Sequence, residues 1–340
     1  MKVNCNMQTA KFPHFPLNNG TSIPAVGLGC WMGNPGEDSR VYDMVLKAIK
    51  NGYRHFDTAS CELCQIDNEK QVCQAIRDSG VPRDDIFLTT KLLSDKHDQV
   101  LEAFEESLSS LDCGYIDLYL MDWPMAYAPG QQGLWSQEAL SVDVWPTFND
   151  AWREMEKLVE TGEPRKIHWC IQLFHPEPRN FLPENDLRRY CESKGIQMVA
   201  WSPLGQPCPD QPISLLPHPT TKSIASALHV SVGQILLSWS IQRGVVVIPK
   251  TENEVRMRDN ISLLPLPERF LKEIDGIHKE EGMHRSLSYV HMMSDDREGK
   301  VFGWSYKQLG WNMKKGGVVK AGGSQIVLPR KSAQGQEYTS

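Results

Sequence analysis

Three charged residues in this sequence close or directly follow short apolar runs: Asp57, Lys91 and Asp122. If these runs are successive parallel strands, their carboxyl ends meet at one edge, which is where barrel enzymes place their reacting side chains. Each residue alone could be a solvated charge at a strand end. A partly buried ammonium group, however, needs a carboxylate partner, so the pattern predicts that Lys91 pairs with a strand-end Asp at the mouth of a barrel.

The elements that would position these charges follow an alternating pattern. Short runs of Val, Ile, Leu and aromatic residues alternate with amphipathic stretches, which predicts an α/β fold of parallel strands joined by helical crossovers. At 340 residues, with 40% hydrophobic residues, the chain can bury one large core, so we expect a single (β/α)8 TIM-type barrel over residues 1–311. The expected strands are 25–30, 53–58, 86–91, 116–121, 166–173, 197–202 and 245–248, and the helical faces are 41–49, 72–76, 101–111 and 148–159.

The number of expected strands is one short of a closed barrel. Seven strands are found where eight are needed, and the shortfall falls in the run 167–174. A parallel neighbour is reached only through a crossover of about a dozen residues or more, so this run holds one strand. Either a βα unit is missing, or another segment closes the ring.

The two ends of the chain carry separate predictions. The turn Asn18-Asn19-Gly20 predicts a hairpin that plugs the amino-terminal end of the barrel. Residues 312–340 are rich in Gly, Lys, Ser and Gln with little periodicity, and we expect a mobile tail there.

Composition and charge restrict the class of protein. The net charge of −6, without clustered Lys and Arg, argues against nucleic-acid binding. No run of about 18 apolar residues and no amino-terminal signal segment are present, which argues against membrane insertion and secretion. Nine cysteines without framework spacing favour reduced thiols. We therefore expect a cytoplasmic protein with small-molecule partners; the oligomeric state stays open, with a monomer favoured.

Seven blocks of the sequence, in chain order, resemble those of the aldo-keto reductase family. They are GYRHFDTA at 52–59, NE at 68–69, TTK at 89–91, IDLYLMDWP at 116–124, MEKLVETG at 155–162, WSPLG at 201–205 and IPKT at 248–251. The resemblance runs from about residue 17 to about residue 264. It implies hydride transfer from NADPH to a carbonyl group, with a Tyr as proton donor, a Lys that lowers the pKa of that Tyr, an Asp paired to the Lys, and a His that orients the carbonyl.

Two of these four catalytic residues match and two do not. Asp57 and Lys91 stand at the positions of the family's Asp and Lys. The loop 60–67, where the Tyr is expected, contains no tyrosine and is about four residues longer than in the family. Glu62 is its one plausible proton donor, although burial would have to raise its pKa while nearby Lys91 would lower it.

Asp122 stands where the resemblance implies a His. A carboxylic acid at this position is associated within the family with reduction of steroid carbon–carbon double bonds, but that subgroup carries Glu and keeps its Tyr. Three carboxylates around Lys91 would also favour keeping one of them protonated, which creates an acid but equally accompanies loss of function.

The resemblance also implies a cofactor site. In the family, a Ser-Asn pair and a Gln bind the carboxamide of the nicotinamide. The Ser-Asn pair is missing after Gly162, and Gln172 is the one partner that remains. Lys250, Thr251 and Arg256 match residues for the adenosine 2′-phosphate, which suits two cations and a hydroxyl, although a solvated helix start is the alternative. The remaining expected cofactor contacts are Cys30, Asp57, Trp201, Ser202, Leu204, Asp259 and Asn260.

The expected substrate pocket is aromatic. The resemblance implies that Trp31 and Trp123 form its wall, which favours hydrophobic carbonyl substrates. It also implies a carboxyl-terminal loop over the pocket, and Trp304, Tyr306 and Trp311 are best placed for that role. Gly27-Leu28-Gly29 lacks the third glycine of a dinucleotide fingerprint. No metal is expected, because the C-x-x-C pair at 61–64 has no second pair to complete four ligands.

Two hypotheses follow. The leading one is an NADPH-dependent oxidoreductase that reduces a hydrophobic aldehyde, ketone or related unsaturated carbonyl compound. The rival is a cofactor-binding relative without catalysis, or a truncated gene product.

Overall fold

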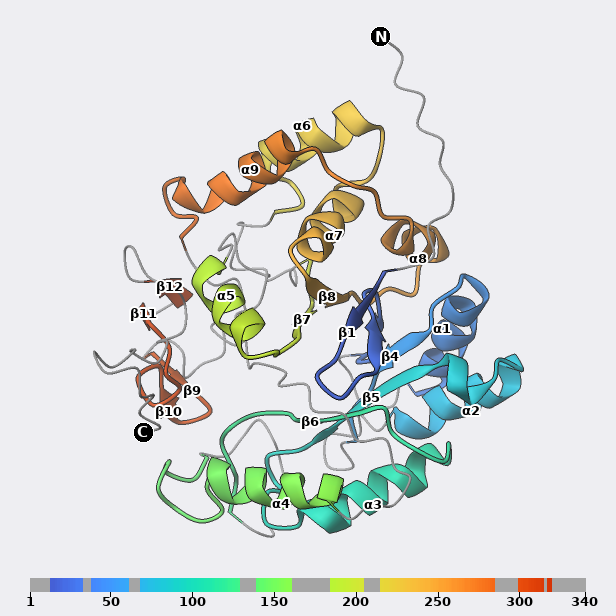
Figure 1. Ribbon diagram of the computed structural model, residues 1–340, viewed down its shortest axis with the longest axis vertical. Helices are drawn as coiled ribbons and strands as arrows, with labels where there is room; N and C mark the ends of the chain where they lie inside the picture. The colour runs from blue at the N-terminus through green and yellow to red at the C-terminus, as the bar shows by residue number, and fades with distance from the viewer. Residues whose placement is uncertain are drawn as a thin grey trace.

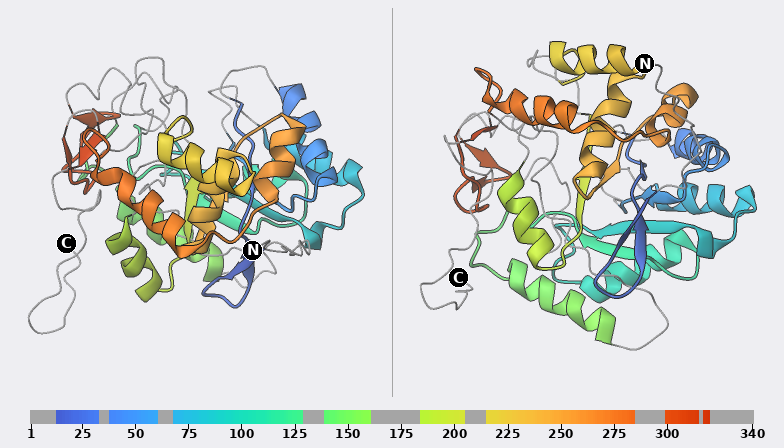
Figure 2. Two further views of the ribbon diagram at one scale, coloured as in Figure 1. Left: turned by 90° about the horizontal axis from the view of Figure 1, so that it is seen from above. Right: turned by 45° about the horizontal axis from the view of Figure 1, so that its top comes forward.

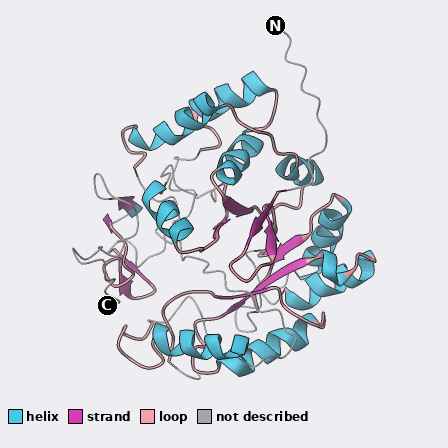
Figure 3. Ribbon diagram, viewed as in Figure 1, coloured by secondary structure: helices cyan, strands magenta, loops and turns pink. Residues whose placement is uncertain are grey.

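The computed structural model describes residues 13–32, 38–60, 68–128, 139–160, 184–204, 215–284, 299–314 and 317–319. Parallel strands lie at its centre, and helices surround them (Figures 1 and 3). The strands are β3 (Leu28–Gly29), β4 (His55–Asp57), β5 (Phe87–Leu92), β6 (Leu118–Met121), β7 (Met198–Trp201) and β8 (Val245–Ile248). The α/β class and the parallel pairing predicted from the alternating pattern are confirmed.

The central strands form one continuous arc. β3, β4, β5 and β6 pair in chain order, and β7 pairs with β8. A parallel bridge between Val26 and Val247 joins the two groups, supported by the Gly27 N–H donating to the Val247 carbonyl at 2.8 Å. The order across the arc is therefore β6-β5-β4-β3-β8-β7. Six of the seven expected strands are confirmed, and the run 166–173 lies outside the described residues.

Helices form where apolar residues recur at helical spacing. α1 (Asp38–Lys50) buries Val41, Met44, Val45, Ala48 and Ile49 against the strands. α2 (Glu69–Ser79), α3 (Val100–Leu111) and α4 (Phe148–Glu160) cover the other expected faces. Where α1 ends, Gly52 takes φ +99, a conformation that glycine adopts without a steric penalty.

A small hairpin covers the amino-terminal ends of the strands. β1 (His14–Pro16) and β2 (Ser22–Pro24) pair antiparallel around the turn at 18–20. Leu17 and Ile23 are buried against side chains such as Phe87, Leu118 and Val246. The predicted plug is confirmed, because its apolar residues cover the barrel's interior from that end.

The carboxyl-terminal half adds helices around β7 and β8 and small hairpins beside β6. The helices are α5 (Asn185–Ser193), α6 (Pro219–Leu228), α7 (Val232–Gln242), α8 (Glu254–Ile261) and α9 (Glu268–Gly276). The hairpins are formed by β9 (Lys300–Val301) with β10 (Trp304–Ser305) and by β11 (Met313–Lys314) with β12 (Val318–Val319). Both views of Figure 2 place these hairpins on the opposite side of the molecule from α1 and α2.

The start of the expected tail takes part in this packing. Met313 and Val319 are buried in one cluster with Trp123, Trp304 and Trp311. Residues 320–340 lie outside the described part, so the boundary at 311 and the mobile tail stay predictions.

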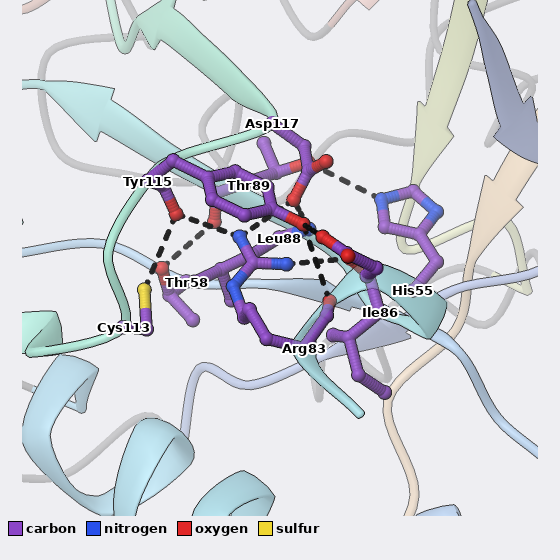
Figure 4. A network of polar contacts seen from close by, with 10 residues as sticks. His55, Thr58, Arg83, Ile86, Leu88, Thr89, Cys113, Tyr115 and Asp117 are labelled. Atoms are coloured by element: carbon purple, nitrogen blue, oxygen red, sulfur yellow. Dashed lines mark hydrogen bonds and ion pairs between the residues drawn. The ribbon is translucent and has the colours of Figure 1, made fainter. Parts of the chain in front are cut away.

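A polar network fixes the amino-terminal ends of β5 and β6 (Figure 4). Arg83, in the short 3-10 helix Arg83–Asp85, donates to Asp117 at 2.7 Å and to the Tyr115 carbonyl at 2.6 Å, and its guanidinium lies 3.9 Å from the centre of the Tyr115 ring. Asp117 also accepts from the Leu88 N–H at 3.0 Å. Because this network lies at the end away from the strand carboxyl ends, we assign it to stability.

Among the described helices, no single one has both the length and the apolar composition of a membrane span. The helix pair α6 and α7, bent by 94°, passes that test by length and composition alone.

Candidate active site

A pocket of ≈ 330 Å³ lies at the carboxyl ends of the strands. It extends from Asp57 and Lys91 on β4 and β5 to Lys250 beyond β8. Of the expected site residues, Cys30, Trp31, Trp201, Ser202 and Leu204 also line it. The arc of strands thus gathers, in one cavity, side chains that are up to 220 residues apart in the chain (30 to 250).

Lys91 and Asp57 form an ion pair inside this pocket. Lys91 Nζ lies 2.6 Å from Asp57 Oδ1 and donates to the Thr58 carbonyl at 2.8 Å, and both paired side chains are about nine-tenths buried. Adjacent parallel strands with matched register produce this contact, since Asp57 pairs with Thr89, two residues before Lys91. Burial raises the pKa of Asp57, and the charge and hydrogen bond of Lys91 oppose that rise.

Asp122, at the end of the next strand, is not among the residues that line the pocket, but Lys91 and Asp57 act on it electrostatically. Its N–H donates to the Leu92 carbonyl at 2.8 Å, which fixes the residue just beyond β6. Burial raises the pKa of Asp122 to about 6, the charges of Asp57 and Asp95 add to the rise, and Lys91 opposes it. A carboxyl group with this pKa carries a proton at weakly acidic pH and can donate it.

Asn68 is a pocket residue that sequence reasoning did not assign to the site. It is buried, its Nδ2 donates to the Cys30 carbonyl at 3.1 Å, and its Oδ1 accepts from the Ala59 N–H at 3.3 Å. Asn68 therefore fastens the ends of β3 and β4 to each other. The Asn68-Glu69 block had drawn attention to this residue as part of the family resemblance. Its role could not be predicted, because Asn68 binds the Cys30 carbonyl, which is far away in the chain.

Gly27 and Gly29 have a packing role. A Cβ atom on Gly27 would lie 2.6 Å from His55 Nδ1, and one on Gly29 would lie 3.1 Å from the Ile248 carbonyl. Both glycines let β3 approach its neighbours closely.

The cofactor half of the predicted site follows β7 and β8. Trp201, Ser202 and Leu204 line the pocket, and Ser202 adopts φ +43, which turns the chain sharply at the end of β7. Lys250 lines the pocket from the β8 side.

The other expected adenosine contacts lie just beyond Lys250. Thr251 is buried and its hydroxyl accepts from the Asn253 N–H at 3.2 Å. Asn253 caps α8 by accepting from the Arg256 N–H at 3.0 Å. Arg256 is exposed in the first turn of α8, whereas Asp259 is half-buried and Asn260 is buried near its end.

The two tryptophans expected in the substrate wall are separated. Trp31 is 37% exposed and lines the pocket, whereas Trp123 is 8% exposed and packs in the cluster with Trp304 and Trp311. The rings of Trp123 and Phe302 meet edge to face at 5.1 Å. Trp304, Tyr306 and Trp311, expected to cover the pocket, are buried in that cluster too.

Some predicted site residues cannot be placed. Glu62, Gln172 and the pair Cys61 and Cys64 lie outside the described residues.

Comparison with known proteins identifies the family. The model described as the aldo/keto reductase family matches residues 25–170 and 171–279. The two segments meet between residues 170 and 171, inside the run 167–174 where the sequence predicts one strand fewer than a closed barrel needs. Because the match spans most of the chain, this protein belongs to the aldo/keto reductase family, whose fold is the (β/α)8 barrel.

Individual relatives are similar over most of their length. Glycerol 2-dehydrogenase (NADP(+)) of Saccharomyces cerevisiae is 36% identical over 300 residues, covering 79% of this chain and 92% of the relative. Aldehyde reductase YPR1 of the same yeast is 34% identical over 298 residues, covering 79% and 92%. Glyoxal reductase of Bacillus subtilis is 33% identical over 290 residues, covering 78% and 92%.

Proposed function

We propose that this protein is an NADPH-dependent oxidoreductase that reduces hydrophobic aldehydes or ketones, or related unsaturated carbonyl compounds. The observation that carries the proposal is one pocket with the buried Lys91–Asp57 pair at one end and Lys250 at the other. The names of the relatives point to the same chemistry, since they include an aldehyde reductase, a glyoxal reductase and an NADP-linked dehydrogenase.

The pocket residues fit the cofactor. Trp201 offers an aromatic face for the nicotinamide ring, and Lys250 offers a cation for a phosphate. Gly29 admits the close approach of β3 that a side chain would prevent. NADPH, when bound, supplies the hydride.

Lys91 and Asp122 would serve the oxygen of the carbonyl group. The ammonium of Lys91, held by Asp57, stabilises the negative charge that develops on this oxygen. In the absence of the family's Tyr and His, Asp122 is the described residue best suited to deliver the proton, because its pKa is raised to about 6. Asp57 is a weaker candidate, since its carboxylate is bound to Lys91.

The substrate class follows from the walls. Trp31 and Met32 enter the pocket beside Trp201, so the surface facing a substrate is largely apolar. We propose a small carbonyl compound with a hydrophobic substituent as the partner, and the cytoplasm as the location.

The proposal is tested first by binding and then by turnover. Titration of NADPH against tryptophan fluorescence measures the dissociation constant, and loss of NADPH absorbance with a panel of aldehydes and ketones measures activity. The matched variants are Lys91→Met and Lys96→Met, since Lys96 lies on the next loop and pairs with exposed Glu106 at 3.0 Å. We expect Lys91→Met to abolish turnover and Lys96→Met to retain it.

The rival hypothesis, a cofactor-binding relative without catalysis, is favoured by two features of the sequence: loop 60–67 contains no Tyr, and the run 167–174 leaves the expected barrel one strand short. Tight NADPH binding without turnover of any carbonyl compound would support it. No binding of NADPH would contradict both hypotheses.

A further inference from the structure

We propose that Glu252 weakens the preference for NADPH over NADH by pairing with Lys250, the pocket cation expected to receive the adenosine 2′-phosphate, while Arg40 holds Glu252 in place. The inference deepens the proposed function and rests on it. It predicts that NADPH is preferred over NADH by less than Lys250 alone would allow, and that removing the negative charge of Glu252 strengthens this preference.

Glu252 is held between two cations. Lys250 Nζ lies 2.9 Å from Glu252 Oε1. From the other side, Arg40 approaches as a fork, with Nη2 at 2.7 Å from Oε1 and Nε at 3.0 Å from Oε2. A guanidinium that meets both oxygens of a carboxylate is among the stronger ion-pair geometries, and here one carboxylate serves two cations.

The charge on Glu252 is secure at neutral pH. Slight burial works against the charge, but hydrogen bonds and charges from Lys250 and Arg40 outweigh it and lower the pKa of Glu252. Glu252 is about one-third exposed, and the lysine that it binds, Lys250, lines the pocket.

The arrangement joins two distant parts of the chain. Arg40 lies in α1, 212 residues before Glu252, and Lys250 lines the end of the pocket that follows β8. α1 and α8 lie side by side, as Figure 1 shows, and Tyr53 beyond α1 donates to the Met257 carbonyl of α8 at 3.1 Å. The position of Glu252 between the cations is therefore supported by packing as well as by charge.

A phosphate and a carboxylate compete for the same donors. A phosphomonoester near Lys250 must either displace Glu252 from that lysine or accept repulsion from its negative charge. The unphosphorylated ribose of NADH carries a 2′-hydroxyl, which can donate a hydrogen bond to a carboxylate. Compared with an uncharged residue at this position, Glu252 therefore weakens binding of NADPH and narrows the difference in affinity between NADPH and NADH.

The experiment measures the dissociation constants of NADPH and NADH by quenching of tryptophan fluorescence, for the wild type and three variants. Glu252→Gln keeps the shape and removes the charge. Glu254→Gln is the matched control, because it is two residues away and pairs with Arg258 at 2.9 Å. Arg40→Met removes one cation and leaves Glu252 to Lys250 alone. Thermal unfolding of each variant establishes that it is folded.

We expect Glu252→Gln to lower the dissociation constant of NADPH by about five- to tenfold and to leave that of NADH unchanged or higher. Glu254→Gln should change neither dissociation constant. Arg40→Met should weaken binding of NADPH more than binding of NADH. Equal effects of Glu252→Gln on the two nucleotides, or no effect, would overturn this inference and leave the proposed function standing. If the wild type binds neither nucleotide, the proposed function fails and the inference fails with it.

Discussion

At the scale of single residues, the site is defined by one lysine among carboxylates. Lys91 contacts Asp57 directly, and its charge also acts on Asp122. Because burial disfavours a second carboxylate charge near Asp57, the proton that the group retains is held most readily by Asp122. The group therefore includes an acid beside the Lys91–Asp57 pair, in a chain whose loop 60–67 carries no tyrosine.

The first prediction concerns this acid. If protonated Asp122 donates to the substrate, turnover is highest below its pKa of about 6 and falls as the pH rises through that value. Asp122→Asn should lower kcat by about 10²- to 10⁴-fold and remove this limb of the pH profile. Glu102→Gln is the control, because Glu102 is exposed in the first turn of α3. This variant should keep both the kcat and the pH profile of the wild type. A pH profile that survives in Asp122→Asn would assign the proton to another group.

Two buried histidines predict how stability depends on pH. Burial lowers the pKa of His55 and of His97 to about 4, whereas an unfolded chain holds it near 6.5. The unfolded state then binds more protons between these values, so stability is complete above pH 6.5 and is lost as the pH falls toward 4.

His97→Leu should reduce this loss, because His97 is 2% exposed and neither ring nitrogen has a hydrogen-bond partner among the described residues. Its contribution between pH 7 and pH 4 is about 3 kcal/mol. Urea unfolding of the wild type and of His97→Leu at the two pH values measures it. An identical loss in both proteins would contradict the pKa assigned to His97.

At the scale of elements, the two ends of β5 and β6 have different tasks. Their carboxyl ends carry Lys91 and Asp122, while their amino-terminal ends are fixed by Arg83 and Asp117 (Figure 4). The side chains of Arg83 and Asp117 are 18% and 11% exposed, so solvent screens this pair weakly. The same strands are thus anchored at one end and hold the candidate chemistry at the other.

This division predicts a variant that loses stability without losing the cofactor. Arg83→Met leaves Asp117 buried without its cation and should lower the free energy of unfolding by about 3 kcal/mol. The exposed pair Arg153–Asp150 is the control, and Arg153→Met should cost less than about 1 kcal/mol. Urea unfolding gives the stability, and fluorescence titration should give an unchanged dissociation constant for NADPH. A large change in that constant would show that the network also shapes the pocket.

At the scale of the whole molecule, the carboxyl-terminal segment is packed against the end of the arc. Trp304 donates from its indole nitrogen to the Leu140 carbonyl at 2.5 Å and shares a buried cluster with Trp123, just beyond β6. The hairpins that carry Trp304 and Met313 of this cluster lie on the opposite side of the molecule from α1 and α2 (Figure 2).

Trp304→Ala should therefore destabilise the protein by about 3–5 kcal/mol, because it removes a large buried ring and a hydrogen bond. The loss of protection in hydrogen exchange should concentrate in residues 299–319 and 139–141. Leu309→Ala, which removes a partly buried side chain packed against the same cluster, should cost less. Uniform loss of protection over the whole chain would contradict the inference that the cluster around Trp304 packs separately from the rest of the core.

Local features of the sequence sufficed to predict six central strands, the helices α1 to α4, the amino-terminal plug and the strand-end positions of Asp57 and Lys91. These depend on local periodicity, on turn residues and on the rule that parallel strands end at one edge. Asn68 on the Cys30 carbonyl, Arg40 on Glu252 and the burial of Trp123 away from the pocket were decided only by the tertiary structure. Each of these contacts joins segments far apart in the chain. The raised pKa of Asp122 also depends on tertiary structure, because it arises from burial and from the charges of Asp57 and Asp95. No local sequence pattern encodes such features.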